Sequence, residues 1–255
     1  MSLLQLSSVA KSFGGLRAVD GVDLNVSEGN ITGLIGPNGS GKTTLFNLIT
    51  GFHRVTGGTI RFDGRETQRL PTYRIAQMGL VRTFQKTTVF PDLSAFENVR
   101  TGSFMRTKTG LAGSLLRTPG FIEERIKARN RAAEILEFLG MARVSHTVAR
   151  NLPYGLLRHL EIAIALAAQP RLLLLDEPAA GLNPEETKEL MGTLRRIREQ
   201  GTSLLLVEHD MKLVMGICDR IAVMNQGQKI AEGAPQEIAS DPQVIRVYLG
   251  EDLDL

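Results

Sequence analysis

The chain has 255 residues, of which 42% are hydrophobic and 22% charged, so it allows one large domain or one domain with an inserted subdomain. The net charge is only +3, so nothing in the overall charge requires a nucleic-acid partner. The single cysteine, Cys218, excludes an internal disulfide and fits a reducing compartment. No basic segment precedes an apolar run at the start, and no stretch approaches the roughly 18 apolar residues of a membrane span. We therefore expect a cytoplasmic protein that needs a spanning partner if it works at a membrane.

Several short elements are expected in the first third of the chain. Four segments have the apolar pattern of strands, namely residues 3–9, 22–26, 31–35 and 59–62. A glycine-rich loop follows the third of them and leads into residues 42–50, which can be helical. The fourth is followed by Asp63-Gly64, which is a turn signal. The region around the loop therefore predicts a strand, a loop and a helix in succession.

The middle of the chain is helical in pattern. Residues 121–140 have helical spacing, with an apolar face made of Ile122, Ile126, Ala133, Leu136 and Leu139. Residues 156–168 are expected to be helical as well. The flanks mix strand and helix, so we predict an α/β core of residues 1–87 and 161–255 into which about 88–160 insert as a helical subdomain.

The last third alternates buried strands with helices. The continuous apolar runs 172–175 and 203–207 are typical of buried parallel strands. The helix between them has a clear start, because Asn183 can be the N-cap, Pro184 occupies the first turn and Glu186 follows the cap by three residues. Residues 220–230 predict a hairpin around the Asn225-Gln226-Gly227 turn.

The glycine-rich loop carries the first chemical motif, since Gly36 to Thr43 match the pattern G-x-x-x-x-G-K-[ST]. Glycines let successive backbone N–H groups point at phosphate oxygens, and the following helix adds its positive end. Lys42 can reach the β- and γ-phosphates, and the hydroxyl of Thr43 can bind Mg²⁺. The expected cofactors are therefore ATP and Mg²⁺. The nucleotide-binding residues expected here are Gly36, Asn38, Gly39, Ser40, Gly41, Lys42, Thr43 and Thr44.

Two acids follow the apolar strand 172–175. Asp176 can hold Mg²⁺ through the coordination shell of the ion, and Glu177 can polarise the attacking water as a general base. An Asp at the carboxyl end of such a strand lies in the crevice where α/β sheets bind ligands. Two acids at a strand end are also common as a solvated turn. The phosphate loop in the same chain favours the catalytic interpretation.

Three single residues complete the candidate site. Gln85 can orient water or Mg²⁺, and His209, which follows the apolar run 203–207, can hydrogen-bond a γ-phosphate. Phe13 can stack on adenine. Each has an ordinary alternative: a surface glutamine, a structural histidine at a strand end, and a core phenylalanine.

The order of these motifs along the whole chain resembles the ABC (ATP-binding cassette) ATPase family. The resemblance implies a P-loop NTPase core of ABC type with an antiparallel β subdomain and an inserted helical subdomain. It implies four roles: the adenine-stacking aromatic for Phe13, the Q-loop glutamine for Gln85, the catalytic glutamate for Glu177 and the switch histidine for His209. Residues 179–183 lie where the family has its D-loop.

Three longer stretches resemble branched-chain amino acid transport subunits of LivG type, namely residues 81–85, 176–184 and 208–215. Relatives that export lipopolysaccharide or import urea share much of this pattern. The resemblance implies an ATPase on the inner face of the cell membrane that binds transmembrane permease subunits. It also implies a second ABC ATPase subunit, in a heterodimer or a homodimer. A periplasmic or extracellular solute-binding protein is implied as an indirect partner.

One element departs from the family pattern. The signature Leu-Ser-Gly-Gly-Gln falls on Leu152-Pro153-Tyr154-Gly155-Leu156, where only Leu152 and Gly155 match. A commonly basic position further along is Ile164. In family dimers each ATP site joins the phosphate loop of one chain to the signature of the other. The departure therefore calls the signature half of one site into question, although Gly155 stays a candidate for nucleotide binding.

Two other classes of function compete with the transporter subunit. A soluble ABC protein that acts on nucleic acid or ribosomes usually has two cassettes or a long coiled coil, whereas this chain has one cassette and no sustained heptads. The basic residues between 100 and 131 are most simply a solvated face, but they can also lie near anionic lipid headgroups or contact nucleic-acid phosphates. A non-hydrolysing regulator is disfavoured by intact Glu177 and His209. We therefore expect no nucleic-acid partner.

Overall fold

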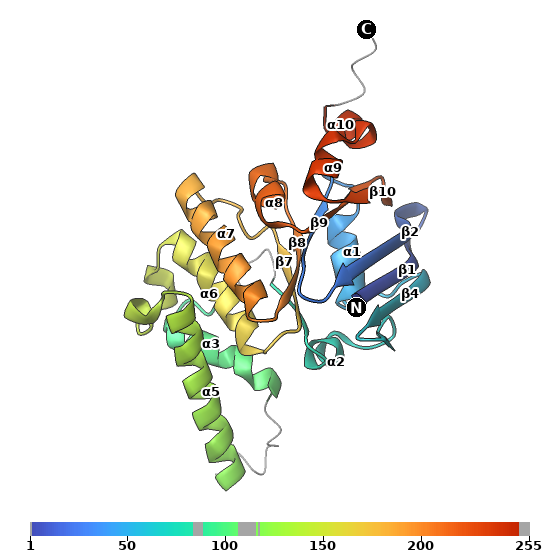
Figure 1. The fold of residues 1–255 in the computed structure, drawn as a ribbon. Coiled ribbons are helices and arrows are strands. Elements are labelled where there is room, and N and C mark those ends of the chain that lie inside the picture. Colours follow the sequence, from blue (N-terminus) through green and yellow to red (C-terminus); the bar gives the residue numbers. More distant parts are fainter. Residues whose placement is uncertain (1, 84–88, 107–115, 117, 250–255) are drawn as a thin grey trace. The chain divides into compact units, whose positions relative to one another are not determined.

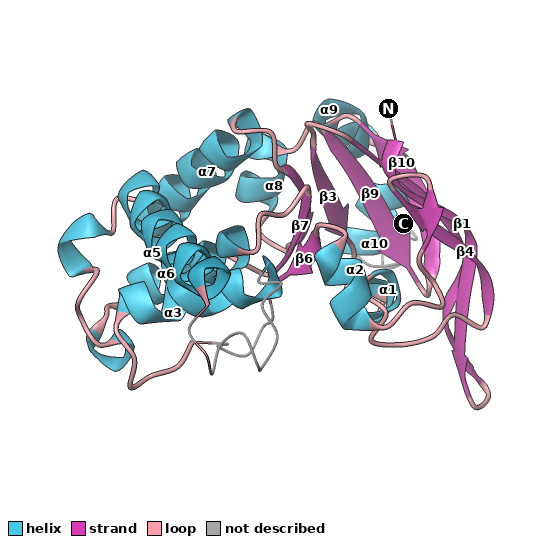
Figure 2. Cartoon of the chain, turned by 90° about the horizontal axis from the view of Figure 1, so that it is seen from below, coloured by secondary structure: helices cyan, strands magenta, loops and turns pink. Residues whose placement is uncertain are grey.

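The computed structural model describes residues 2–83, 89–106, 116 and 118–249 (Figure 1). Its contacts divide the chain into two compact units, Met1–Arg82 with Arg171–Leu255 and Thr83–Pro170. Every described strand belongs to the first unit, whereas the second contains helices (Figure 2). The expected boundary between residues 160 and 161 would fall inside helix α6 (Tyr154–Ala167), which lies whole within the second unit.

The first unit begins with an antiparallel sheet, as the family resemblance implies. Its strand order is β2-β1-β4-β5, with β1 Ser2–Phe13, β2 Leu16–Ser27, β4 Gly57–Phe62 and β5 Arg65–Glu66. The strands expected at residues 3–9 and 22–26 lie in the amino-terminal part of the longer β1 and the carboxyl-terminal part of the longer β2. These strands bury alternate apolar side chains such as Leu4 and Leu6, and the turn between them contains Gly14 with a φ of 56°.

The second sheet of this unit has six strands in the order β10-β9-β3-β8-β7-β6. They are β3 Ile31–Ile35, β6 Leu80–Arg82, β7 Leu172–Asp176, β8 Ser203–Val207, β9 Arg220–Asn225 and β10 Gln228–Gly233. All of these strands except β10 are parallel, and β10 pairs antiparallel with β9 in the predicted hairpin. Strands β3, β7 and β8 are buried at every residue, which explains their mostly apolar sequences.

Six described helices accompany these sheets in the first unit: α1 Lys42–Ile49, α2 Thr72–Gln77, α7 Pro184–Glu199, α8 Met211–Ile217, α9 Pro235–Ser240 and α10 Pro242–Leu249. The predicted start of α7 is confirmed, because Asn183 Oδ1 accepts hydrogen bonds from the backbone N–H groups of Glu185 and Glu186. In turn, Glu186 Oε2 accepts a hydrogen bond from the Asn183 N–H, which completes a capping box. Within the described residues, no helix combines the length and apolar character needed to cross a membrane.

The second unit contains α3 Ala95–Gly102, α5 Pro119–Phe138 and α6, with the short 3₁₀ turns Ser103–Arg106, Ala142–Val144 and Ala149–Asn151. Helix α3 packs closely on α6, since a Cβ at Gly102 would lie 2.1 Å from the carbonyl oxygen of Ile164. The predicted apolar face of α5 is partly wrong. Ala132, Ile135 and Leu136 are buried, but Ile122, Ile126 and Ala133 are exposed. For Ile122 and Ile126 the reason is that the amino-terminal turns of α5 extend beyond α3 and α6 (Figure 1).

Candidate nucleotide-binding site

The phosphate loop connects β3 to α1 at the carboxyl end of the strand. Gly36 has a φ of 148°, and a Cβ there would lie 2.1 Å from the carbonyl oxygen of Met224 in β9. Gly41 has a φ of 101°, and its Cβ would lie 2.5 Å from the carbonyl oxygen of Ala18. Both positions therefore require glycine, because a side chain would collide with neighbouring backbone. Gly41 is also the N-cap of α1, so no side chain competes with a phosphate for the first N–H groups of the helix.

Lys42 lies inside the curl of the loop. Its Nζ donates hydrogen bonds to the carbonyl oxygens of Gly36 at 2.7 Å and Pro37 at 2.9 Å. Burial lowers the pKa of Lys42, and the nearby carboxylates of Glu177 and Asp176 oppose that shift. A positive charge is therefore held where the loop can present it to phosphates.

Hydroxyl groups complete the loop. Ser40 Oγ is buried and has no hydrogen-bond partner among the described residues, which suits a group that bonds a ligand. Thr43 and Thr44 open α1, and the Thr43 side chain is exposed. Together with the N–H groups of the loop, these residues form the polar cradle that the motif predicts.

The carboxylate pair lies at the carboxyl end of β7. Asp176 is buried, and its Oδ2 accepts a hydrogen bond from Arg82 Nη2 at 2.6 Å. No described residue donates a hydrogen bond to its Oδ1. A free carboxylate oxygen together with a threonine hydroxyl suits Mg²⁺, which prefers oxygen ligands and few protein contacts. Glu177 is half-buried with a φ of 50°, and its N–H donates to the carbonyl oxygen of Val207.

Two residues of this region were missed in the sequence analysis. Arg82, at the end of β6, bonds Asp176 and also Asn47 Oδ1 of α1 at 2.6 Å. Glu208, directly after β8, is 1% exposed and accepts from the N–H of Ala179 at 2.7 Å and of His209 at 3.1 Å. Burial raises the pKa of Glu208, and these backbone bonds oppose the rise. Each is a charged residue at the carboxyl end of an apolar strand, which is the signal that could have found them.

His209 and Phe13 present exposed rings. The His209 side chain is 67% exposed, and its Nδ1 lies 4.0 Å from Glu208 Oε2. Phe13 ends β1 with 43% exposure, in edge contact with the ring of His53 at 5.4 Å and with Lys11 Nζ 4.9 Å from its centroid. An exposed phenylalanine is available to stack on a base. Gln85 lies outside the described residues.

Strand order explains why these groups meet. Strands β3, β8, β7 and β6 are successive parallel neighbours, so their carboxyl ends share one edge of the sheet. That edge bears the phosphate loop, Glu208-His209, Asp176-Glu177 and Arg82, which is the position at which open α/β sheets bind ligands. Gly155 belongs to the second unit, where it is buried in the first turn of α6.

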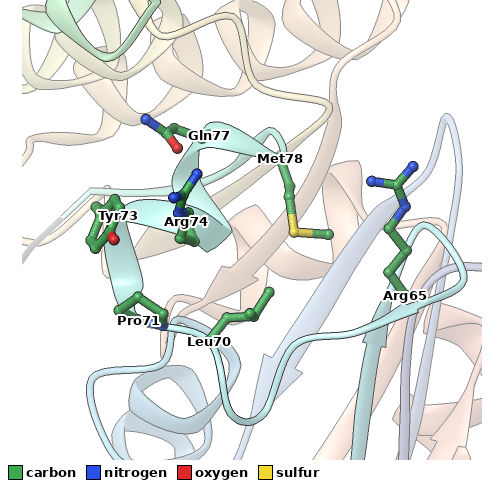
Figure 3. A pocket seen from close by; sticks show the side chains of 7 residues that line it. All are labelled: Arg65, Leu70, Pro71, Tyr73, Arg74, Gln77 and Met78. Carbon is green, nitrogen blue, oxygen red and sulfur yellow. The ribbon is translucent and has the colours of Figure 1, made fainter.

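A separate pocket of about 480 Å³ lies beside α2 in the first unit (Figure 3). Its lining residues are Arg65, Leu70, Pro71, Tyr73, Arg74, Gln77 and Met78. The Arg74 guanidinium lies 5.4 Å from the centroid of the exposed Tyr73 ring. The pocket contains no residue of the phosphate loop or of the carboxylate pair, so it is distinct from the nucleotide site.

Comparison with known proteins identifies the class. The chain matches the family described as ABC transporter over residues 19–180, so this fold and site are those of an ATP-binding cassette, an ATPase of the ABC class. A solved cassette of an ABC transporter in its ADP conformation has a TM-score of 0.86 and 32% identity, and the match covers 98% of this chain and 99% of that one. A dimeric cassette in a post-hydrolysis state, bound to ADP and Pi, has a TM-score of 0.75 and 26% identity, with 91% and 98% of the two chains covered.

The relatives narrow the class further. Residues 228–254 match the family described as branched-chain amino acid ATP-binding cassette transporter. The chain is 50% identical over 250 residues to the high-affinity branched-chain amino acid transport ATP-binding protein LivG of Salmonella typhimurium, and the match covers 98% of each chain. The chain therefore belongs to the LivG family of ABC transporter ATP-binding subunits.

Proposed function

We propose that this chain hydrolyses ATP on the inner face of the cell membrane and thereby powers uptake of branched-chain amino acids through permease partners. The observation that carries the proposal is the 50% identity to a LivG protein over 98% of both chains. A separate match to the branched-chain amino acid family also supports the proposal. It covers residues 228–254, near the carboxyl terminus and far in sequence from the phosphate loop.

The proposed hydrolysis uses the sheet edge described above. Lys42 and the N–H groups of the phosphate loop bind the β- and γ-phosphates, and Phe13 stacks on the adenine. Thr43 and Asp176 hold Mg²⁺, which when bound neutralises phosphate charge. The other residues assigned to nucleotide binding are Gly36, Asn38, Gly39, Ser40, Gly41, Thr44 and Gly155. Gly155 offers its backbone N–H to the ATP whose phosphate loop belongs to the second cassette.

Three further residues act on the attacking water and the γ-phosphate in this proposal. Glu177 takes a proton from the water as a general base. His209, whose ring is exposed, donates a hydrogen bond to the γ-phosphate. Gln85 orients the water or the Mg²⁺. Glu208 holds the backbone of His209 and so fixes the position from which that ring reaches the phosphate.

The proposed partners follow from transport. Transmembrane permease subunits supply the path across the membrane, and a periplasmic or extracellular solute-binding protein delivers the amino acid to them. A second ABC ATPase subunit completes each ATP site with its signature, in a heterodimer rather than a homodimer. The segment after Gln85, residues 86–104, docks a cytoplasmic helix of a permease, so that the state of the nucleotide can move it.

The test is transport in proteoliposomes that contain this chain, its permease subunits and the second cassette. We expect ATP-dependent leucine uptake that Lys42→Ala abolishes and that Lys188→Ala, a change at an exposed lysine of α7, leaves intact. Charge reversals among residues 86–104 should lower uptake and leave basal ATP hydrolysis unchanged. Uptake of urea but not of leucine would contradict the proposed solute. Unchanged uptake across the whole scan would contradict the proposed docking segment.

A further inference from the structure

A buried ion pair links the carboxyl ends of β6 and β7. Arg82 Nη2 lies 2.6 Å from Asp176 Oδ2, and the two side chains are 6% and 1% exposed. Burying a carboxylate and a guanidinium is costly unless both are paired and hydrogen-bonded. An arginine at this depth therefore has a specific task, and it lies beside the carboxylate assigned to the Mg²⁺ site.

The same guanidinium also contacts the helix that follows the phosphate loop. Arg82 Nη1 donates to Asn47 Oδ1 of α1 at 2.6 Å, and the guanidinium carbon lies 5.4 Å from the centroid of the Phe46 ring. The planar fork of arginine can hold two acceptors in fixed directions, which a single ammonium group cannot do. One side chain therefore joins three elements, β6, β7 and α1.

The two oxygens of Asp176 have different surroundings. Oδ2 accepts the hydrogen bond from Arg82, whereas Oδ1 is buried and has no hydrogen-bond partner among the described residues. A carboxylate fixed through one oxygen presents the other in one direction. Buried polar atoms are normally hydrogen-bonded, so an unpartnered Oδ1 at the ligand-binding edge of the sheet points to a ligand.

We propose that Arg82 is a positioning residue for the nucleotide-bound Mg²⁺. Anchored by Asn47, it fixes Asp176 through Oδ2 and so directs Oδ1 toward the metal. The inference rests on the proposed function, in which Asp176 holds Mg²⁺. Residues that orient a metal ligand typically change metal affinity by about 10–100-fold when they are replaced. Loss of Arg82 should therefore lower the affinity of the nucleotide-bound site for Mg²⁺ by that factor, while nucleotide binding without Mg²⁺ should stay unchanged.

The experiment measures binding of a fluorescent, non-hydrolysable ATP analogue to the purified chain in EDTA and during a Mg²⁺ titration. Arg82→Gln should raise the Mg²⁺ midpoint by about 10–100-fold. Arg82→Lys keeps a positive charge beside Asp176 and should give a smaller rise. Asn47→Ala leaves both charges in place and only loosens the anchor, so it should shift the midpoint least.

The matched control is Arg198→Gln. Arg198 Nη1 lies 3.3 Å from Asp219 Oδ1, before β9 and thus at the opposite end of the same sheet. This change also removes an arginine–aspartate pair, but it should leave the Mg²⁺ midpoint at the wild-type value. Any general effect of losing an arginine would appear in the control as well.

Asp176→Asn separates the two hypotheses. If it raises the midpoint while all Arg82 and Asn47 variants bind Mg²⁺ like the wild type, the positioning role is wrong and the Mg²⁺ role of Asp176 stands. If Asp176→Asn also leaves the midpoint unchanged, the proposed Mg²⁺ site itself is wrong. With the inference correct, Arg82→Gln adds no further shift in the Asp176→Asn background. Equal losses of binding in EDTA and in Mg²⁺ would show a merely structural role and overturn the inference.

Discussion

Restoring the serine and the glutamine of the family signature should raise the ATP turnover of this chain when it is alone. The change is Pro153→Ser together with Leu156→Gln. Pro153 is the N-cap of α6 with φ −54° and ψ 152°, an extended conformation that serine adopts readily at N-caps. Leu156 is half-buried in the first turn, so a glutamine there can keep its stem packed and its amide at the surface.

The size of the effect follows from the missing hydroxyl. A serine hydroxyl that bonds a γ-phosphate contributes about 1.5–3 kcal/mol, because one partner is charged. That range corresponds to about 10–150-fold in affinity or rate. The same serine can cap α6 when no nucleotide is present, which should stabilise the fold by about 1 kcal/mol. The wild-type chain, as a homodimer, should therefore be a weak ATPase, and the restored variant a clearly faster one.

The assay is steady-state ATP hydrolysis by the purified chain, with thermal unfolding measured in parallel. Glu177→Gln in the restored background must abolish the gain, which excludes a contaminating ATPase. A heterodimer with the second cassette should be active already, since one of its sites joins this phosphate loop to the partner's signature. Brisk wild-type turnover that the restoration leaves unchanged would refute the argument that the two sites differ.

Three other predictions concern single residues of the first unit. Lys42→Ala should abolish tight ATP binding, measured by equilibrium fluorescence, because the charge that faces the β- and γ-phosphates is lost; wild-type affinity would contradict this role. Glu177→Gln should keep binding and slow turnover by roughly 10²-fold or more, the scale of a lost general base, so turnover at the wild-type rate would show that Glu177 is not the base. Glu208→Gln should change the pH dependence of stability. Folding raises the pKa of Glu208 above its ordinary value of 4.5, so the folded state binds this proton more tightly, and the free energy of unfolding of the wild type falls as the pH rises from about 4.5 through the folded-state pKa. The glutamine variant lacks this contribution. Urea unfolding measured in steps of about one pH unit between about pH 4 and pH 8 should therefore show a free energy of unfolding that changes less with pH in the variant. Parallel pH curves for the two proteins would rule out the buried carboxyl as the cause.

Local physical chemistry made much of the fold predictable from the sequence. The expected strands 31–35 and 203–207 have the observed bounds, because a buried parallel strand is a nearly continuous apolar run. Asn183 and Glu186 form the predicted capping box, since both partners lie within one helical turn. The strand, loop and helix around Lys42 follow from a motif of eight contiguous residues. In each case the deciding sequence pattern lies within a few contiguous residues.

Tertiary contacts decided the rest. Arg82 and Asp176 are 94 residues apart, and Glu208 is 29 residues from the backbone N–H that it accepts at Ala179. No periodicity or motif relates such positions, because only the strand order brings their ends together. The exposed Ile122 of α5 shows the converse, since the helical pattern marks an apolar residue but not whether another helix reaches it. The sequence by itself therefore determined the elements and the phosphate-binding chemistry, whereas the pairing of distant charges and the burial of each helix face depended on the packing of the folded chain.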